Sequence, residues 1–272
     1  MNILDAIIAT EFRYASATGA GIRKFPASVR VSDERIPERD AYNYLFVSSE
    51  ASLEKARRIV AEELNEFGRT NAPHVKIVFH PLNRHWQRIE ELESFRVARR
   101  FIMACPLSNP LTAAPDEHCL MAEKSSFEAL YAFEFHMYEQ KGTDYARLQT
   151  EIKLDTYASS DAFDIVVYTI GGLIVGNVEL FRNNDIVKFD DFKVHEDFRR
   201  RGFGKKIQRA ALSKACRDGA AYLYAITDDD GFVRELYEKD GFTEVGVLHT
   251  FKKRAVPDNS DRLDANAEAP HE

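Results

Sequence analysis

Residues 197–207 read DFRRRGFGKKI, in which five cationic side chains surround the glycines Gly202 and Gly204. Three interpretations compete for this stretch: a basic patch for nucleic acid, a solubilising surface run, or a loop whose backbone holds a phosphate. The formal net charge of the 272-residue chain is −7, which argues against a general nucleic-acid binder, because such proteins attract phosphates with a positive field.

The elements on either side favour the phosphate loop. IVKFDDFKV at 186–194 predicts a strand, and KKIQRAALSKACRDG at 205–219 predicts a helix with an apolar stripe. N–H groups at a helix start point outward and carry the positive end of the helix dipole. The stretch matches neither GxxxxGK[ST] nor GxGxxG, so a nucleoside triphosphate or a dinucleotide is disfavoured.

The sequence around this loop predicts an αββ order followed by βαβαβ. Helices are expected at 125–142 and 145–157, and a β-hairpin at 163–181 turns at Gly171 and Gly172. After the helix at 205–219 we expect a strand at 221–227, a short helix at 232–242 and a final strand at 243–253.

Two linked motifs in this half resemble the Gcn5-related N-acetyltransferase (GNAT) superfamily. The family signature [QR]-x-x-G-x-[GA] stands here as RRRGFG at 199–204, and its Tyr-x-x-x-Gly-Phe arrangement stands as YEKDGF at 237–242. The resemblance covers about 117–255. It implies an α/β (α+β) fold with a mixed, mostly antiparallel sheet flanked by helices, the acyl-CoA acyltransferase fold.

The resemblance also implies an acetyl-CoA site. Backbone N–H groups of the glycine loop would hold the pyrophosphate, and the edge of strand 186–194 would bind the pantetheine arm and the acyl carbonyl. The cofactor-binding residues expected from it are Phe192, Lys193, Val194, Arg199, Arg200, Arg201, Gly202, Phe203, Gly204 and Lys205.

The catalytic roles follow from attack of a neutral amine on a thioester. The oxyanion needs an N–H donor, for which Val194 is our candidate, and Tyr237 is the candidate acid for the leaving thiolate. For the base, Asp190, Asp191 and Glu179 stay open, and for each a solvated or ion-paired carboxylate is the alternative. His195 follows the strand, but it is better interpreted as a surface loop residue than as the base.

Some positions depart from the family pattern. The family often carries Asn and Ala seven and four residues before the tyrosine, where this chain has Asp230 and Val233. With Asp228 and Asp229, Asp230 places negative charge near the expected coenzyme arm.

The first 116 residues carry the same β-α-β-α-β order as 186–251. A shift of 147 positions lays Leu45 and Val47 on Phe192 and Val194, and Glu90 on Tyr237. SSEASLEK replaces the glycine loop, so this half resembles a degenerate GNAT-like repeat without a coenzyme site. We interpret its Trp86 as a core or interface residue.

The sequence thus predicts three parts: an N-terminal α/β domain at 1–116, an N-acetyltransferase domain at 117–255 and a disordered tail at 256–272. The three cysteines share no ligand or disulfide spacing, so no metal site is expected. Neither a secretory signal nor an apolar run of about 20 residues is evident, which predicts a cytoplasmic protein without a membrane partner.

The resemblance implies transfer of an acetyl group from acetyl-CoA to a primary amine in a ternary complex. A noncatalytic acyl-CoA-binding module of the same fold is the alternative. The acceptor, a small molecule or a peptide, has no signature in the sequence, and oligomerisation stays open.

Overall fold

The computed structural model describes the chain except residues 1, 71, 108–115, 124–125, 229–230 and 256–272. It forms two compact units: unit 1, of Met1–Ile22 and Arg99–Leu248, and unit 2, of Arg23–Ala98 and His249–Glu272. These bounds differ from a division near residue 116. The first helix and most of the strand Arg96–Pro106 pack in unit 1, and the end of the strand Thr243–Arg254 packs in unit 2. The predicted tail at 256–272 and residues 108–115, next to the predicted boundary at 116, lie outside the described residues.

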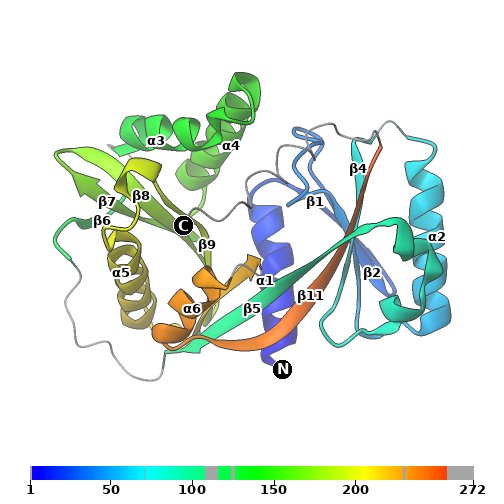
Figure 1. Cartoon of the computed structure of the whole chain (residues 1–272). Coiled ribbons are helices and arrows are strands. Elements are labelled where there is room, and N and C mark those ends of the chain that lie inside the picture. Colours follow the sequence, from blue (N-terminus) through cyan, green and yellow to red (C-terminus); the bar gives the residue numbers. More distant parts are fainter. Residues whose placement is uncertain (1, 71, 108–115, 124–125, 229–230, 256–272) are drawn as a thin grey trace, which may run out of the picture. The chain divides into compact units, whose positions relative to one another are not determined.

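Unit 1 is built on a sheet with the strand order β11-β5-β10-β9-β8-β7-β6 (Figure 1). Neighbours pair antiparallel from β9 to β6 and between β10 and β5, whereas β9 and β10 pair parallel. The predicted mixed, mostly antiparallel sheet is therefore confirmed. The strands are β5 (Arg96–Pro106), β6 (Cys119–Met121), β7 (Phe163–Ile170), β8 (Leu173–Asn183), β9 (Ile186–Val194), β10 (Tyr222–Asp228) and β11 (Thr243–Arg254).

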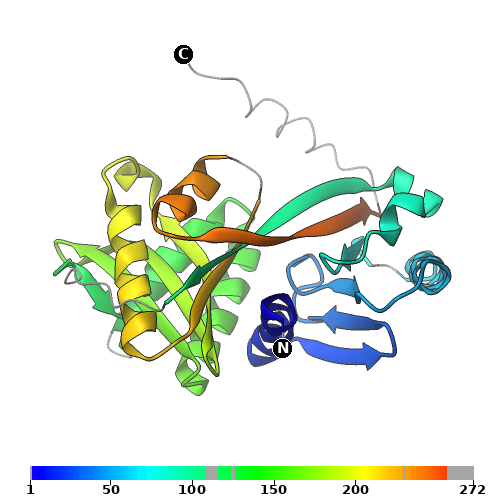
Figure 2. The same cartoon turned by 90° about the horizontal axis from the view of Figure 1, so that it is seen from below.

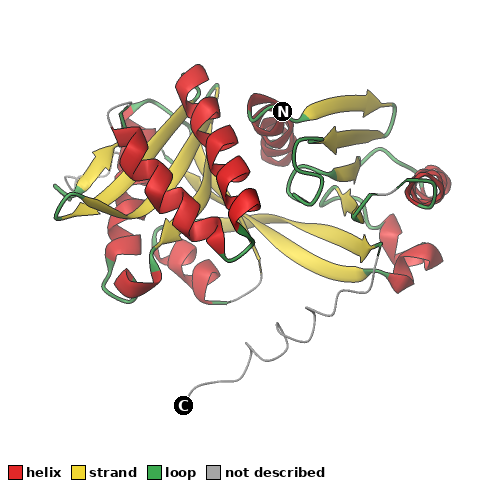
Figure 3. Cartoon of the chain, turned by 90° about the horizontal axis from the view of Figure 1, so that it is seen from above, coloured by secondary structure: helices red, strands yellow, loops and turns green. Residues whose placement is uncertain are grey.

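Helices cover both faces of this sheet. α5 (Phe203–Arg217) lies on one face of β7–β9, and α3 (Phe127–Glu139) and α4 (Thr143–Ser159) lie on the other, as Figures 2 and 3 show. α6 (Phe232–Lys239) precedes β11, and α1 (Ile3–Ala17) packs on β8 and β9. The predicted stripe of α5 is confirmed, since its members are buried in the main core of the unit: Ile207, Ala211 and Ala215.

Unit 2 has the strand order β1-β2-β3-β4-β11. Its elements are β1 (Gly21–Phe25), β2 (Ser28–Ser32), β3 (Tyr44–Val47), α2 (Leu53–Phe67), β4 (His74–Phe79) and two 3₁₀ turns, η1 (His85–Arg88) and η2 (Glu90–Ser94). A separate apolar core includes Val60, Ile77, Phe79 and Phe251. The second helix of the β-α-β-α-β order predicted for the first 116 residues is thus a pair of short 3₁₀ turns.

The structure extends the internal repeat that the sequence predicts. β5 and β11 begin at Arg96 and Thr243, which are 147 positions apart, as are the starts of η1 and α6 at His85 and Phe232. The parallel pair β3–β4 repeats as β9–β10. The same shift also relates the strands β1 and β2, which the sequence did not indicate, to β7 and β8. The two repeats exchange their final strands. β5, the last strand of the N-terminal repeat, pairs antiparallel with β10 of the C-terminal repeat. β11, the last strand of the C-terminal repeat, pairs antiparallel with β4 of the N-terminal repeat.

Candidate active site

The two parallel strands of unit 1 part from each other halfway along. β9 and β10 pair only from Ile186–Tyr222 to Lys188–Tyr224, although both strands continue. Just beyond, β9 has a bulge, because Asp191 and Phe192 together oppose the single residue Val178 on β8. Asp191 has φ of 50°, a left-handed value that a bulge accommodates. In the described part of the chain, the second half of β9 therefore presents a free edge on its β10 side.

The backbone direction at the end of β9 places two N–H groups on this free edge. Val194 and Gly176 form a non-hydrogen-bonded pair, because His195 N donates to Val175 O at 2.9 Å. The N–H and C=O of Val194 thus point away from β8. Its carbonyl accepts a hydrogen bond from Arg199 Nε at 3.0 Å. By alternation Phe192 points the same way and Lys193 points toward β8, so the edge offers Phe192 and Val194 as donors.

The glycine loop leads from this edge to the open start of α5. Gly202 occupies the N-cap position with φ of 80°, and no side chain caps the helix. The first backbone bond of the helix runs from Lys206 N to Gly202 O. The N–H groups of Phe203, Gly204 and Lys205 precede that bond and have no partner within the helix. The first turn contains no acidic residue, so the positive end of the dipole is not offset locally.

Glycine is required at positions 202 and 204 for different structural reasons. Gly202 needs the left-handed conformation, and a Cβ there would meet nothing within 4 Å. A Cβ on Gly204 would lie 3.2 Å from the Phe192 ring. Gly204 thus allows α5 to pack closely on β9. The side chains of Arg199, Arg200, Arg201 and Lys205 are exposed beside the loop.

Tyr237 of α6 is buried, with 5% of its surface exposed. Its ring packs edge-on against Phe189, with centroids 5.9 Å apart, and against Phe242 at 5.1 Å. Phe189 follows directly after the last paired residue of β9, so Tyr237 lies where the two strands part. This position fits a tyrosine that only packs in the core as well as a tyrosine that acts as an acid.

Glu179 and Asp190 oppose each other on β8 and β9. Glu179 is 2% exposed and accepts a hydrogen bond from the Tyr157 hydroxyl. Burial and the charge of Asp190 raise the pKa of Glu179, although Lys153 and two tyrosine hydroxyls act against them. Burial also disfavours ionisation of Asp190, but Lys188 and the Tyr14 hydroxyl outweigh it and lower the pKa of Asp190. The pKa values of the pair are thus pushed apart.

Sequence reasoning missed a buried ionic cluster under α3. Glu134 is fully buried and contacts Lys153 at 2.7 Å, Lys193 at 2.6 Å and Asn177 at 2.6 Å. Both lysines also pair with Asp191 at the bulge. Asp191 is therefore a structural member of this cluster rather than a free base. The sequence signal that was overlooked is Glu134, a charged residue among the aromatic residues of helix 125–142.

The remaining predicted polar residues have structural partners. His195 accepts the Asp197 N–H through Nδ1 and stacks on His136, with ring centroids 4.6 Å apart. It therefore caps the short turn after β9. Asp228 is exposed and accepts a hydrogen bond from Arg100 Nε at 3.0 Å. Asp229 and Asp230 lie outside the described residues.

The repeat in unit 2 lacks the features of this edge. β3 and β4 stay paired to Val47–Phe79, and His80 N donates to Val47 O at 2.9 Å. The start of α2 is capped, because Ser52 Oγ accepts from Lys55 N. In place of a parted edge and an open helix start, unit 2 has a closed pair of strands and a capped helix.

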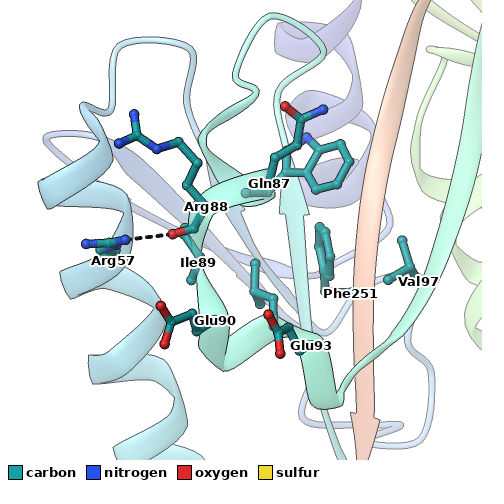
Figure 4. Close-up of a pocket in the computed structure, with 10 residues that line it drawn as sticks. Arg57, Gln87, Arg88, Ile89, Glu90, Glu93, Val97 and Phe251 are labelled. Carbon is teal, nitrogen blue, oxygen red and sulfur yellow. Dashed lines mark hydrogen bonds between the residues drawn. The ribbon is translucent and has the colours of Figure 1, made fainter.

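A depression of about 470 Å³ in unit 2 lies between α2 and the 3₁₀ turns (Figure 4). Arg57 of α2 donates to the carbonyl of Arg88 at 2.8 Å, and Glu90, at the place of Tyr237, is exposed on the rim. Trp86 stacks on His249 at 4.3 Å and contacts Phe251, consistent with a core role. The guanidinium group of Arg57 is thus used to hold a turn.

Comparison with known proteins identifies the fold of unit 1. The family model described as "Acetyltransferase (GNAT) domain" matches residues 136–254. None of the curated proteins matches the chain.

Solved structures resemble the chain over most of its length. A GCN5-related N-acetyltransferase from Kribbella flavida is 14% identical with a TM-score of 0.66, covering 94% of this chain and 97% of its own. A functionally unknown conserved protein from Staphylococcus epidermidis is 13% identical with a TM-score of 0.67, covering 88% and 96%. A tandem GNAT protein from the clavulanic acid biosynthesis pathway, 13% identical, has a TM-score of 0.50 over 74% and 70%. Such identities show the fold alone, and the last is consistent with two GNAT-like repeats.

The family match covers the parted strands, the glycine loop and Tyr237, the same elements that carry the two linked motifs of the sequence. None of the helices in the described part of the chain has the length and apolar composition that a membrane crossing requires. Residues 136–254 therefore form a GNAT domain.

Proposed function

We propose that this protein transfers an acetyl group from acetyl-CoA to a primary amine within a ternary complex. The observation that carries the proposal is the continuity of the free edge of β9 with the uncapped start of α5. The edge offers N–H donors to a pantetheine arm, and the helix start offers N–H groups and dipole charge to a pyrophosphate. The two donor sets, Phe192 and Val194 on the strand and residues 203–205 at the helix start, lie nine to thirteen positions apart on one strand–loop–helix segment.

When bound, acetyl-CoA supplies the thioester carbon that the amine attacks. The N–H of Val194, which points to the free edge, is the donor we assign to the developing oxyanion. The hydroxyl of Tyr237, beside the point where the strands part, is the group we assign to protonate the thiolate. Asp190 and Glu179 are the carboxylates that can take the proton of the amine. The amine is a small molecule or the amino group of a peptide.

Binding of the coenzyme is tested by calorimetry with acetyl-CoA on the wild type and on Gly202→Asp. An aspartate is favourable at an N-cap and tolerates a positive φ, so the helix is kept while a carboxylate occupies the place of the pyrophosphate. Gly202→Asn is the matched neutral control. We expect binding in the wild type and the Asn variant and its loss in the Asp variant. Absent binding in the wild type would overturn the proposal.

A noncatalytic coenzyme-binding module is the second candidate. The buried position of Glu179 and the ion pairs of Asp190 and Asp191 favour it, because no carboxylate of the site is both unpaired and exposed among the described residues. Coenzyme binding without thiol release across a panel of amines would support this function instead.

All three cysteines are free thiols, in keeping with our proposal that the protein acts in the cytoplasm.

A further inference from the structure

A carboxylate from the N-terminal helix spans the place where β9 and β10 part. Lys188 and Tyr224 are opposite each other in the last paired rung of these strands. Glu11 of α1 accepts a hydrogen bond from the Tyr224 hydroxyl through Oε1 at 2.7 Å and from the Lys188 ammonium through Oε2 at 3.0 Å. The two oxygens of one carboxylate thus hold one strand each, and Glu11 lies outside the family match at 136–254.

Helix α1 is fixed in this position by contacts on both sides of Glu11. The Thr10 hydroxyl oxygen accepts a hydrogen bond from Asn183 Nδ2 of β8 at 2.9 Å, and Arg13 donates to Asn183 Oδ1 at 2.6 Å. Of the ion-paired side chains, 19% of Glu11 and 6% of Lys188 are exposed. The pair is therefore largely shielded from solvent, and its geometry is restrained by the docking of the helix.

The same ammonium group also reaches the carboxylate of Asp190. Lys188 Nζ lies 3.2 Å from Asp190 Oδ2, so one lysine is shared between two carboxylates. The side chain of Asp190 is 31% exposed, whereas Glu179 opposite is buried, and burial raises its pKa. Burial also opposes the charge of Asp190, but Lys188 prevails and lowers the pKa of this carboxyl. Because Glu11 offsets Lys188, the ionised Asp190 leaves one net negative charge on the three groups.

Two further cations near Asp190 have carboxylate partners of their own. Arg100 of β5 pairs with Asp228 at 3.0 Å, and Lys153 of α4 pairs with Glu134 at 2.7 Å. The titratable groups that face Asp190 and the opposed Glu179 come from four elements: Glu11 and Tyr14 of α1, Lys153 and Tyr157 of α4, Lys188 of β9 and Arg100 of β5. Each cation of this set is thus matched by a carboxylate from another element.

We propose that Glu11 is a positioning residue of the acetyltransferase site, which neutralises Lys188 at the last rung so that the Asp190 carboxylate attracts and orients a cationic acceptor amine. This role rests on the proposed acetyl transfer. A primary amine is mainly an ammonium at neutral pH, and an exposed carboxylate with uncompensated charge holds it by a charge-assisted hydrogen bond. The first helix of the chain, which precedes the GNAT domain, thereby completes the acceptor site of that domain.

The contact is tested first without coenzyme or acceptor, by hydrogen exchange read out by mass spectrometry. Glu11→Gln keeps the shape of the side chain but no longer forms an ion pair with Lys188. We expect backbone exchange in the peptides that cover β10 to become about tenfold faster. Asp5→Asn removes a charge from the first turn of the same helix and should leave exchange in β10 unchanged. Wild-type exchange in Glu11→Gln would overturn the inference.

Turnover then separates charge from packing, with the best acceptor among ethanolamine, tyramine, spermidine and a tripeptide with a free amino terminus. Glu11→Gln should raise KM for the amine about tenfold, with kcat within about threefold of the wild type and the Kd of acetyl-CoA unchanged. The double variant Glu11→Gln/Lys188→Met restores the net charge, so its KM should return to within about threefold of the wild type.

Two kinetic results would overturn the inference: wild-type KM in Glu11→Gln, or a double variant at least as impaired as the single one, which is the result that a merely structural Glu11 predicts. A wild type that binds no acetyl-CoA or acetylates no amine contradicts the proposed function instead. In that case the hydrogen exchange still decides whether Glu11 holds the last rung of β9 and β10.

Discussion

The Glu134 carboxylate lies 2.6 Å from the Lys193 ammonium and thereby ties α3 to the last part of β9. Lys193 follows the bulge that turns Phe192 and Val194 toward the free edge. The same carboxylate contacts Lys153 of α4 and Asn177 of β8. Burial opposes its charge, but the two ammonium groups prevail and lower the pKa of Glu134 to about 2. One buried anion therefore fixes two helices and two strands around the bulge.

Replacing this anion should destabilise the protein strongly. Glu134→Gln removes one charge from a buried cluster and leaves two lysines opposite Asp191 alone. We expect a loss of about 3 kcal/mol in the free energy of unfolding, measured by urea denaturation. Glu139→Gln, on the exposed face of the same helix, is the matched control and should stay within about 0.5 kcal/mol. Equal stabilities of the two variants would contradict the assigned role.

The same carboxylate predicts how stability depends on acid. The folded pKa of about 2 lies below the ordinary glutamate value of 4.5, so protonation favours the unfolded state. Its contribution is fully present above about pH 4.5 and is lost as the pH falls toward about 2. Urea midpoints measured from pH 7 to pH 3 should decline more steeply in the wild type than in Glu134→Gln. Parallel curves would show that another group governs this range.

The elements of unit 1 were predictable because each has a strong local pattern. The strand at 186–194 coincides with β9, and the helix at 205–219 is shifted by two residues from α5. The turn at Gly171 and Gly172 joins β7 to β8 as expected. The glycine loop could be located because left-handed glycine and an uncapped helix start are local properties.

The parts of the site that could not be predicted from the sequence depend on contacts between distant segments. Glu11 of the first helix meets Lys188 of β9 across 177 positions, and no periodicity in that helix marks the contact. The pairing of β5 with β10 and of β11 with β4 likewise depends on tertiary context. The bulge at Asp191 could not be inferred from alternation, because an added residue reverses which side chains share a face.

The glycine loop predicts that charge at the start of α5 governs coenzyme affinity. Lys205 is exposed in the first helical turn, and Arg217 is exposed in the last. Lys205→Glu places an anion where it favours the helix by up to about 1 kcal/mol but repels a pyrophosphate. We expect the Kd of acetyl-CoA to rise at least about tenfold by calorimetry. Arg217→Glu makes the same change of charge at the far end of the helix and should leave Kd within about twofold. A similar loss in both would indicate only a general charge effect.

The position of Tyr237 predicts a variant that separates packing from chemistry. Tyr237→Phe keeps the contacts with Phe189 and Phe242, so the free energy of unfolding should change by less than about 1 kcal/mol. Without the hydroxyl, the leaving thiolate loses its acid, and kcat for amine acetylation should fall about 100-fold while the Kd of acetyl-CoA is kept. Tyr237→Ala, which also empties the core position, should lose about 3 kcal/mol of stability in addition. Wild-type kcat in Tyr237→Phe would assign the tyrosine to packing alone, and the free edge of β9 would then have to lower the barrier without an acid beside it.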